Sequence, residues 1–164
     1  MAGNHLEDLI AEWHQYQGYF VRRNVQVGKR NTGGYECELD VVAFHPEKQR
    51  LVHIEPSLDC YKWEKREERY RKKFNAGRKY IPGLFRGLNI PAHLEQVAIF
   101  VYAGRGERTT IGGGKIVLIK EFMDEIMSEI VKHRVASAAV PEEFPLIRTL
   151  QFAANFWTAV NVNG

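Results

Sequence analysis

Carboxylates interrupt two short segments that otherwise have the composition of buried strands. The first segment is ECELDVVAF at residues 36–44, and the second is LVHIEPS at residues 51–57. The residues between them, 45–50, are mostly polar and suit the connection of a β-hairpin. Pairing the two strands would bring Asp40 close to Glu55, and two buried carboxylates repel each other and lose hydration. A chain keeps such a pair where something compensates, and a divalent cation with oxygen ligands is the usual partner.

Strand alternation divides the side chains of each segment between two faces. In the first segment one face is acidic and the other apolar: Glu36, Glu38 and Asp40 oppose Cys37, Leu39 and Val41. In the second segment Glu55 shares its face with His53 and Ser57. Pro56 has no N–H group for a ladder hydrogen bond, so the second strand should be at an edge, bulged or ending there.

The composition describes an ordinary globular domain. Of the 164 residues, 45% are hydrophobic and 26% are charged, which is enough for one domain with its own core, 1–164. No run approaches the roughly 20 apolar residues of a membrane span, so we expect no membrane partner. Residues 1–5 do not begin a secretory signal, so we expect a cytoplasmic location.

The remaining pattern predicts a mixed sheet flanked by helices, an α/β fold. Apolar spacing predicts helices at 5–17, 61–80, 121–134 and 146–157, with residues 82–83 closing the second one. It predicts further strands at 19–27, 96–102 and 115–119, and a glycine-rich loop at 104–114.

Positive charge is concentrated in residues 61–80, where nine lysines and arginines face three glutamates, a net charge of +6. Such a stripe suits contacts with the phosphates of a nucleic acid, but it also suits a solvated helix face with internal ion pairs. The acidic cluster just upstream favours the first interpretation. The expected nucleic-acid contacts are Lys62, Arg66, Arg69 and Lys73, with Lys29 and Arg30 in the turn at 28–34.

The order of these features resembles the PD-(D/E)XK nuclease superfamily, nearest to its Holliday-junction-resolvase-type members. A helix bears an acid, a strand follows a glycine and an aromatic residue, Glu-Leu-Asp lies on the next strand, and another acid on a third strand precedes a helix. The resemblance covers about residues 7–80. It implies a restriction-endonuclease-like fold whose motif core is residues 1–80, with 81–164 adding strands and helices.

The resemblance also implies a magnesium-dependent DNA endonuclease. Asp40 and Glu55 match the acids that hold Mg²⁺ or Mn²⁺ and activate water against a phosphodiester. Glu7 matches the helix-borne metal ligand of resolvase-like members, and Glu38 belongs to the Glu-Leu-Asp form. Glu7 is equally explained as an acid that stabilises the start of its helix.

Ser57 departs from the family pattern, because a lysine should occupy its position. Three explanations remain open. A basic residue of the following helix, with Lys62 nearest, supplies the cation; His53 acts as a base or extra ligand; or hydrolysis has been lost and nucleic-acid binding kept. A different class of function is a protein-interaction module that docks or forms a homodimer through the aromatic stretch 144–157.

Overall fold

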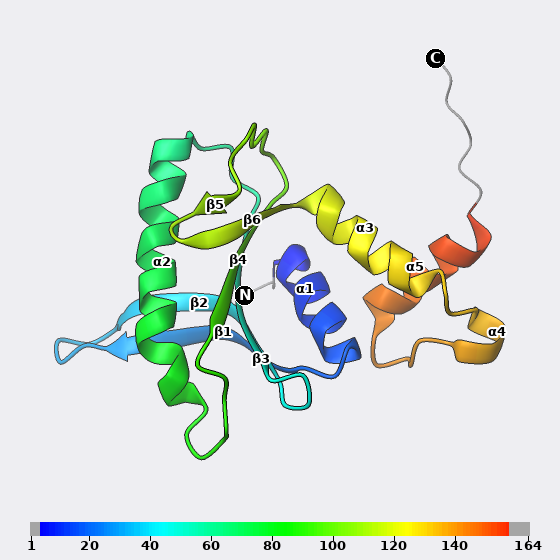
Figure 1. Cartoon of the computed structure of the whole chain (residues 1–164), viewed down its shortest axis with the longest axis horizontal. Helices are drawn as coiled ribbons and strands as arrows, with labels where there is room; N and C mark the ends of the chain where they lie inside the picture. Colours follow the sequence, from blue (N-terminus) through cyan, green and yellow to red (C-terminus); the bar gives the residue numbers. More distant parts are fainter. Residues whose placement is uncertain (1–3, 158–164) are drawn as a thin grey trace.

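A six-stranded mixed sheet with helices on both faces organises the chain (Figure 1). The structure is a computed structural model that describes residues 4–157. The strand order is β1-β2-β3-β4-β6-β5. The strands are β1 (Phe20–Lys29), β2 (Tyr35–His45), β3 (Arg50–Ser57), β4 (Leu94–Phe100), β5 (Thr110–Ile111) and β6 (Gly114–Leu118). Strands β1, β2 and β3 are antiparallel neighbours, β4 and β6 continue parallel to β3, and β5 is antiparallel to β6.

The helices cover the two faces of the sheet unequally. They are α1 (His5–Tyr16), α2 (Trp63–Leu84), α3 (Ile119–Ile130), α4 (Val135–Ala138) and α5 (Pro145–Phe156). Helix α2 runs along one face, whereas α1, α3 and α5 gather on the other (Figure 1). This arrangement confirms the α/β class and the mixed sheet. None of the helices within residues 4–157 combines the length and apolar content that crossing a membrane requires.

Several predicted boundaries shift, most visibly at the end of α2. This helix continues through Pro82 to Leu84 instead of ending at residues 82–83. A proline in the last turn removes one backbone donor without preventing the final residues from remaining helical. The loop predicted at 104–114 contains the short strand β5, and α3 ends at Ile130 rather than at residue 134. Residues 1–3 and 158–164 of the predicted domain lie outside the described residues.

The predicted hairpin of β2 and β3 is confirmed, and its pairing stops beside the two acids. The last paired residues are Val41 and Ile54, so Asp40 and Glu55 follow at the point where the strands separate. Pro56 lies beyond this point. Its missing N–H therefore breaks no bond to β2, although β3 is an interior strand.

Asp40 is also unpaired with its other neighbour, β1. Asn24, which lies opposite Asp40 in the register, has a left-handed φ of 51° and is missing from the ladder. Near this interruption the alternation of β2 changes, because Leu39 packs with the cluster of Val42 on the α2 side, whereas Val41 packs on the α1 side. The predicted shared face of Leu39 and Val41 is therefore wrong. The backbone N–H of Asp40 is therefore free to donate a hydrogen bond to a side chain.

Candidate active site

Lys73 of α2 lies between the two strand carboxylates. Its Nζ is 2.6 Å from Asp40 Oδ1 and also donates to Glu55 Oε2. The Lys73 side chain is 17% exposed, that of Asp40 12% and that of Glu55 1%. The predicted proximity of Asp40 and Glu55 is thus found, and the ammonium group between them compensates part of their charge.

Glu55 is held by three further contacts. Its Oε1 accepts hydrogen bonds from the backbone N–H of Asp40 at 3.1 Å and from Nε2 of His53 at 2.7 Å. Its backbone carbonyl accepts from the hydroxyl of Tyr70 at 3.1 Å. The His53 side chain is fully buried, and its ring meets the edge of Phe74 with 5.3 Å between the ring centres. The side chain of Glu55 therefore has a fixed position at the end of β3.

Burial and the neighbouring charges shift the pKa values of the groups in this cluster. Burial and the nearby charge of Glu55 raise the pKa of Asp40 to about 7. Burial disfavours the charge of Lys73, but attraction to Glu55 and Asp40 outweighs this cost and raises its pKa. Burial, together with the charge of Lys73, lowers the pKa of His53 to about 3, so its ring is neutral at pH 7. Near neutral pH the site can therefore hold or release one proton at Asp40.

The cation that reaches the acids is Lys73 and not Lys62. Lys62 is exposed and lies just before the first turn of α2, at the N-cap position. Lys73 follows Arg66 and Tyr70 at helical spacing, on the stripe that α2 turns toward the sheet. This stripe carries the signal that sequence reasoning missed, because a lysine within a buried helical stripe needs a carboxylate partner.

Ser57 supports a separate polar cluster beside the acids. Its hydroxyl donates to Asp59, whose carboxylate accepts from Arg66 Nε at 3.0 Å and from Arg69 Nη1 at 3.0 Å. Arg66 is only 3% exposed and also donates to the carbonyl of Tyr102 at 2.9 Å. Arg66 is therefore not available as a nucleic-acid contact, because its guanidinium is buried among these acceptors. Asp59 was not predicted, since a single acid in a connecting segment has no distinctive pattern.

The two other predicted metal ligands are placed differently. Glu7 of α1 is mostly buried and lies 4.0 Å from Arg23. Burial and the charge of Asp40 raise the pKa of Glu7, so its carboxyl lies within electrostatic range of the cluster. Glu38 is exposed on β2 opposite Gln26, whereas the side chain of Asp40 is buried. The structure thus brings Glu7 toward the site and leaves Glu38 at the surface.

The residues that would hold a metal ion are few. Within residues 4–157, no group of three or more histidine, cysteine, aspartate or glutamate side chains is arranged around a common metal position. Mg²⁺ is usually bound by one or two carboxylates, with water and substrate phosphate completing its shell. Asp40 and Glu55 are the carboxylates of this cluster that could take part in such a shell, and Lys73 contacts both of them.

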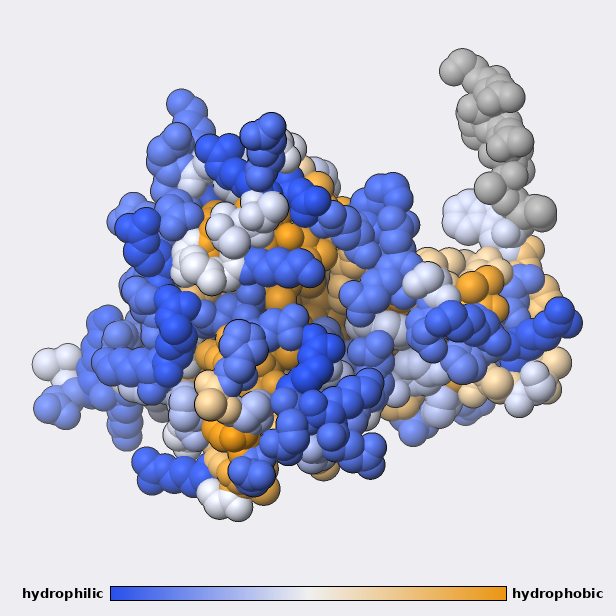
Figure 2. Space-filling model, in the orientation of Figure 1, coloured by the Kyte–Doolittle hydropathy of each residue, from blue (hydrophilic) through white to orange (hydrophobic). Residues whose placement is uncertain are grey.

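A largely hydrophilic surface covers α2 and the β1–β2 hairpin. Figure 2 shows this surface over α2 and over the β1–β2 hairpin, which extends away from the sheet. Its exposed basic residues include Lys62, Lys65, Arg69, Lys72, Lys29 and Arg30. Lys65, Arg69 and Lys73 are four residues apart, so they form one row along α2 that leads from the surface to the acids.

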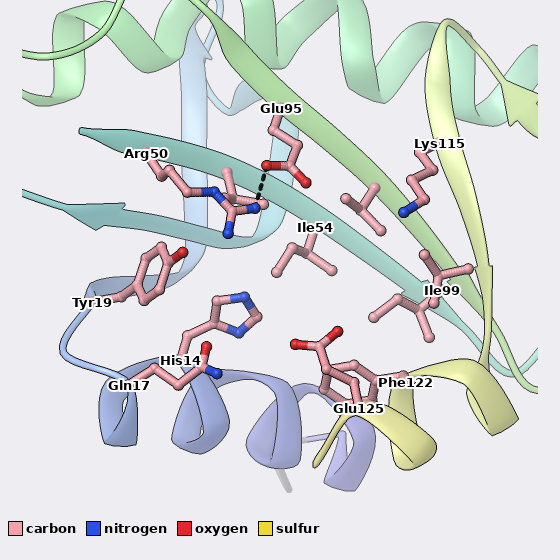
Figure 3. Close-up of a pocket in the computed structure, with 13 residues that line it drawn as sticks. His14, Gln17, Tyr19, Arg50, Ile54, Glu95, Ile99, Lys115, Phe122 and Glu125 are labelled. Carbon is pink, nitrogen blue, oxygen red and sulfur yellow. Dashed lines mark hydrogen bonds and ion pairs between the residues drawn. The ribbon is translucent and has the colours of Figure 1, made fainter. Parts of the chain in front are cut away.

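A small cavity lies on the opposite face of the sheet, between α1 and α3. It has a volume of about 100 Å³, with His14 and Glu125 pointing into it and an Arg50–Glu95 ion pair of 2.6 Å beside it (Figure 3). Nδ1 of His14 donates to the carbonyl of Ile10 at 2.7 Å, and burial lowers the pKa of this histidine. The sheet separates this cavity from the acidic cluster, so it contributes no group to the candidate site.

Comparison with known proteins leaves the family open. The sequence matches no protein-family model, and a search of curated proteins found no match.

Proposed function

We propose that this chain is a metal-dependent nuclease that hydrolyses phosphodiester bonds in DNA. The observation that carries the proposal is the position of Lys73 between two buried carboxylates at the point where β2 and β3 separate. Burying groups of opposite charge costs hydration free energy that packing of apolar residues would not. Such groups are therefore concentrated at functional sites, where the charges take part in binding or catalysis. The resemblance to the PD-(D/E)XK superfamily and its restriction-endonuclease-like fold supports the same conclusion, with the lysine supplied by α2.

Each residue of the cluster has a role in this proposal. Carboxylate oxygens of Asp40 and Glu55 would hold Mg²⁺ or Mn²⁺, and Glu7 could accept a hydrogen bond from metal-bound water. When bound, such an ion lowers the pKa of a water molecule and stabilises charge on the phosphate. Lys73 would keep an ammonium group beside the phosphate oxygens, where negative charge develops during attack.

The row of cations on α2 supplies a path for the substrate backbone. Lys65 and Arg69 are exposed and precede Lys73 by eight and four residues on the same side of the helix. Arg69 is oriented by Asp59 at 3.0 Å, so its guanidinium has a defined direction without being buried. A phosphate backbone lying along this row would reach Lys73 and the acids.

Cleavage assays test the proposal directly. Purified protein is mixed with supercoiled, linear, branched and single-stranded DNA in the presence of Mg²⁺ or Mn²⁺. We expect cleavage of at least one substrate, and we expect Asp40→Asn, Glu55→Gln and Lys73→Met to reduce the rate at least 100-fold. Glu68→Gln, an exposed change on α2, is the matched control and should cleave normally. Absence of cleavage with every substrate, or undiminished cleavage by Asp40→Asn, would refute the catalytic proposal.

One observation favours a second candidate, a nucleic-acid-binding protein without hydrolysis. Lys73 already contacts both acids, so the cluster is partly neutralised without a metal ion. This alternative predicts that DNA binding survives Asp40→Asn and weakens when Lys62, Lys65, Arg69 and Lys72 are neutralised. Each lost phosphate contact should reduce the slope of log affinity against log salt by about 0.9.

A further inference from the structure

A chain of hydrogen bonds runs from the surface of α2 to Glu55. Arg78 Nη1 donates to Gln96 Oε1, and Gln96 Nε2 lies 3.1 Å from His53 Nδ1. His53 Nε2 in turn lies 2.7 Å from Glu55 Oε1. Arg78 is exposed, Gln96 and His53 are buried, and Arg78 is further oriented by Asn75 at 2.5 Å.

The orientation of the Gln96 amide follows from its neighbours. A guanidinium group can only donate, so the amide oxygen must face Arg78. A backbone carbonyl can only accept, so the amide nitrogen must face the carbonyl of Phe74, at 2.9 Å. Both ends of the amide are thus determined. The second N–H of Gln96 points to His53 Nδ1.

This orientation determines which nitrogen of His53 carries the proton. Since Gln96 donates to Nδ1, that nitrogen has a free lone pair and no hydrogen. In the neutral ring the proton must then be on Nε2, which donates to Glu55 Oε1. His53 therefore has no free nitrogen with which to act as a base or bind a metal ion, two of the roles considered for it from the sequence.

The two oxygens of Glu55 consequently have different surroundings. Oε1 accepts from both the His53 ring and the backbone N–H of Asp40, whereas Oε2 faces Lys73. We infer that Gln96 and His53 are positioning residues that fix Oε1 of Glu55 and present Oε2 alone to a cation. The metal-binding half of this statement rests on the proposed nuclease function. The assignment of the His53 proton does not.

The packing of α2 protects this arrangement. A Cβ atom added to Gly77 would lie 2.3 Å from His53 Nδ1 and 2.9 Å from Gln96 Nε2. Any side chain at position 77 would therefore displace the ring or the amide. The close approach of α2 to the hydrogen-bond chain requires glycine at this place.

Nitrogen NMR of the full chain, labelled with ¹⁵N in histidine, tests the inference. A protonated and an unprotonated ring nitrogen have well-separated chemical shifts, so the tautomer of His53 can be read in the wild type once its signal is identified among the six histidines by comparison with His53→Gln. Gln96→Glu places a carboxylate that can only accept beside Nδ1, and we expect Nδ1 to gain a proton while Nε2 keeps the proton that it donates to Glu55. The positively charged ring would then draw negative charge from Glu55, so we expect the Kd for Mn²⁺ to rise 10–100-fold. Gln15→Glu, an exposed change of the same charge on α1, should alter neither quantity.

The outcomes separate the inference from the proposed function. Protonation of His53 on Nδ1 in the wild type would overturn the inference, as would unchanged Mn²⁺ affinity once Nδ1 has gained a proton in Gln96→Glu. If the wild type binds no Mn²⁺, the proposed function fails, and the wild-type tautomer alone decides the inference. If Gln96→Glu does not fold, the wild-type spectrum still decides the position of the proton.

Discussion

Replacing Lys73 with methionine is expected to lower the free energy of unfolding by about 3–5 kcal/mol when divalent ions are absent, because removal of one partner leaves buried charges unpaired. Lys73 Nζ lies 2.6 Å from Asp40 Oδ1 and contacts Glu55, whose side chain is 1% exposed. Methionine keeps the unbranched apolar stem, so the change removes mainly the charge. For a chain of 164 residues, each kcal/mol corresponds to about 2–4 °C, so the melting temperature should fall by about 10 °C.

Thermal unfolding followed by circular dichroism in EDTA measures this loss. Lys72→Met is the matched control, because Lys72 is the exposed neighbour of Lys73 on the same helix. Surface changes of this kind usually stay within about 0.5 kcal/mol of wild type. Added Mn²⁺ should then stabilise Lys73→Met more than wild type, because the two carboxylates have lost their ammonium partner. A concentration 100 times the Kd corresponds to about 2.7 kcal/mol.

Two results bear on different parts of this reasoning. A melting temperature of Lys73→Met equal to that of Lys72→Met would refute the claim that the buried ion pair stabilises the fold. A large loss of stability in EDTA that Mn²⁺ does not reverse would support the stabilising ion pair and count against the metal site.

Three further predictions follow from the same geometry. The lowered pKa of His53 makes the fold less stable as the pH falls from 6.5 to about 3, whereas the raised pKa of Asp40 makes it more stable as the pH falls from 7 to about 4. Asp40→Asn lacks the second effect, so urea unfolding should show it losing about 2 kcal/mol more than wild type between pH 7 and 5. Equal slopes of unfolding free energy against pH would contradict this. Because φ at position 24 is 51°, Asn24→Val should lower the free energy of unfolding by about 1–3 kcal/mol in the same assay, and Asn24→Gly should leave it almost unchanged. Equal stabilities of the two variants would rule out backbone strain at this position. Gly77→Ala should destabilise the fold by about 1–3 kcal/mol through its contact with His53, whereas Gly83→Ala on the same helix has open space around it and should stabilise the fold by up to about 1 kcal/mol. Stability changes of the same sign in both variants would disprove the close packing at Gly77.

The neighbourhood of Asp40 and Glu55 could be predicted from the sequence because it depends on local rules. A period of two places each acid on a strand, and a short polar connection makes the strands pair as a hairpin. The observed register ends at Val41 and Ile54, immediately before the two acids. What alternation could not predict is the interruption at Asn24, because a left-handed asparagine within a strand depends on its surroundings rather than on its neighbours in sequence.

The lysine and the hydrogen-bond chain could not be found in the same way. Lys73 reaches the acids because α2 crosses the sheet at a particular rotation, and that rotation is determined by tertiary packing. Gln96 follows Glu95 near the start of an otherwise apolar strand, so its sequence context does not distinguish it from a surface residue. Its partners Phe74 and His53 are 22 and 43 residues away in the chain.

In the proposed nuclease, the cation beside the acids would come from α2 and not from the position of Ser57. At the position where the nuclease resemblance expects a lysine, the serine is 4% exposed and its hydroxyl donates to Asp59. Asp59 in turn orients Arg69, in the same helical row as Lys73. In this proposal the lysine comes from α2, and Ser57, through Asp59, helps hold that helix against the sheet. The proposed chemistry requires an ammonium group within hydrogen-bond distance of both carboxylates, and an adjacent helix can meet this requirement as well as the strand itself.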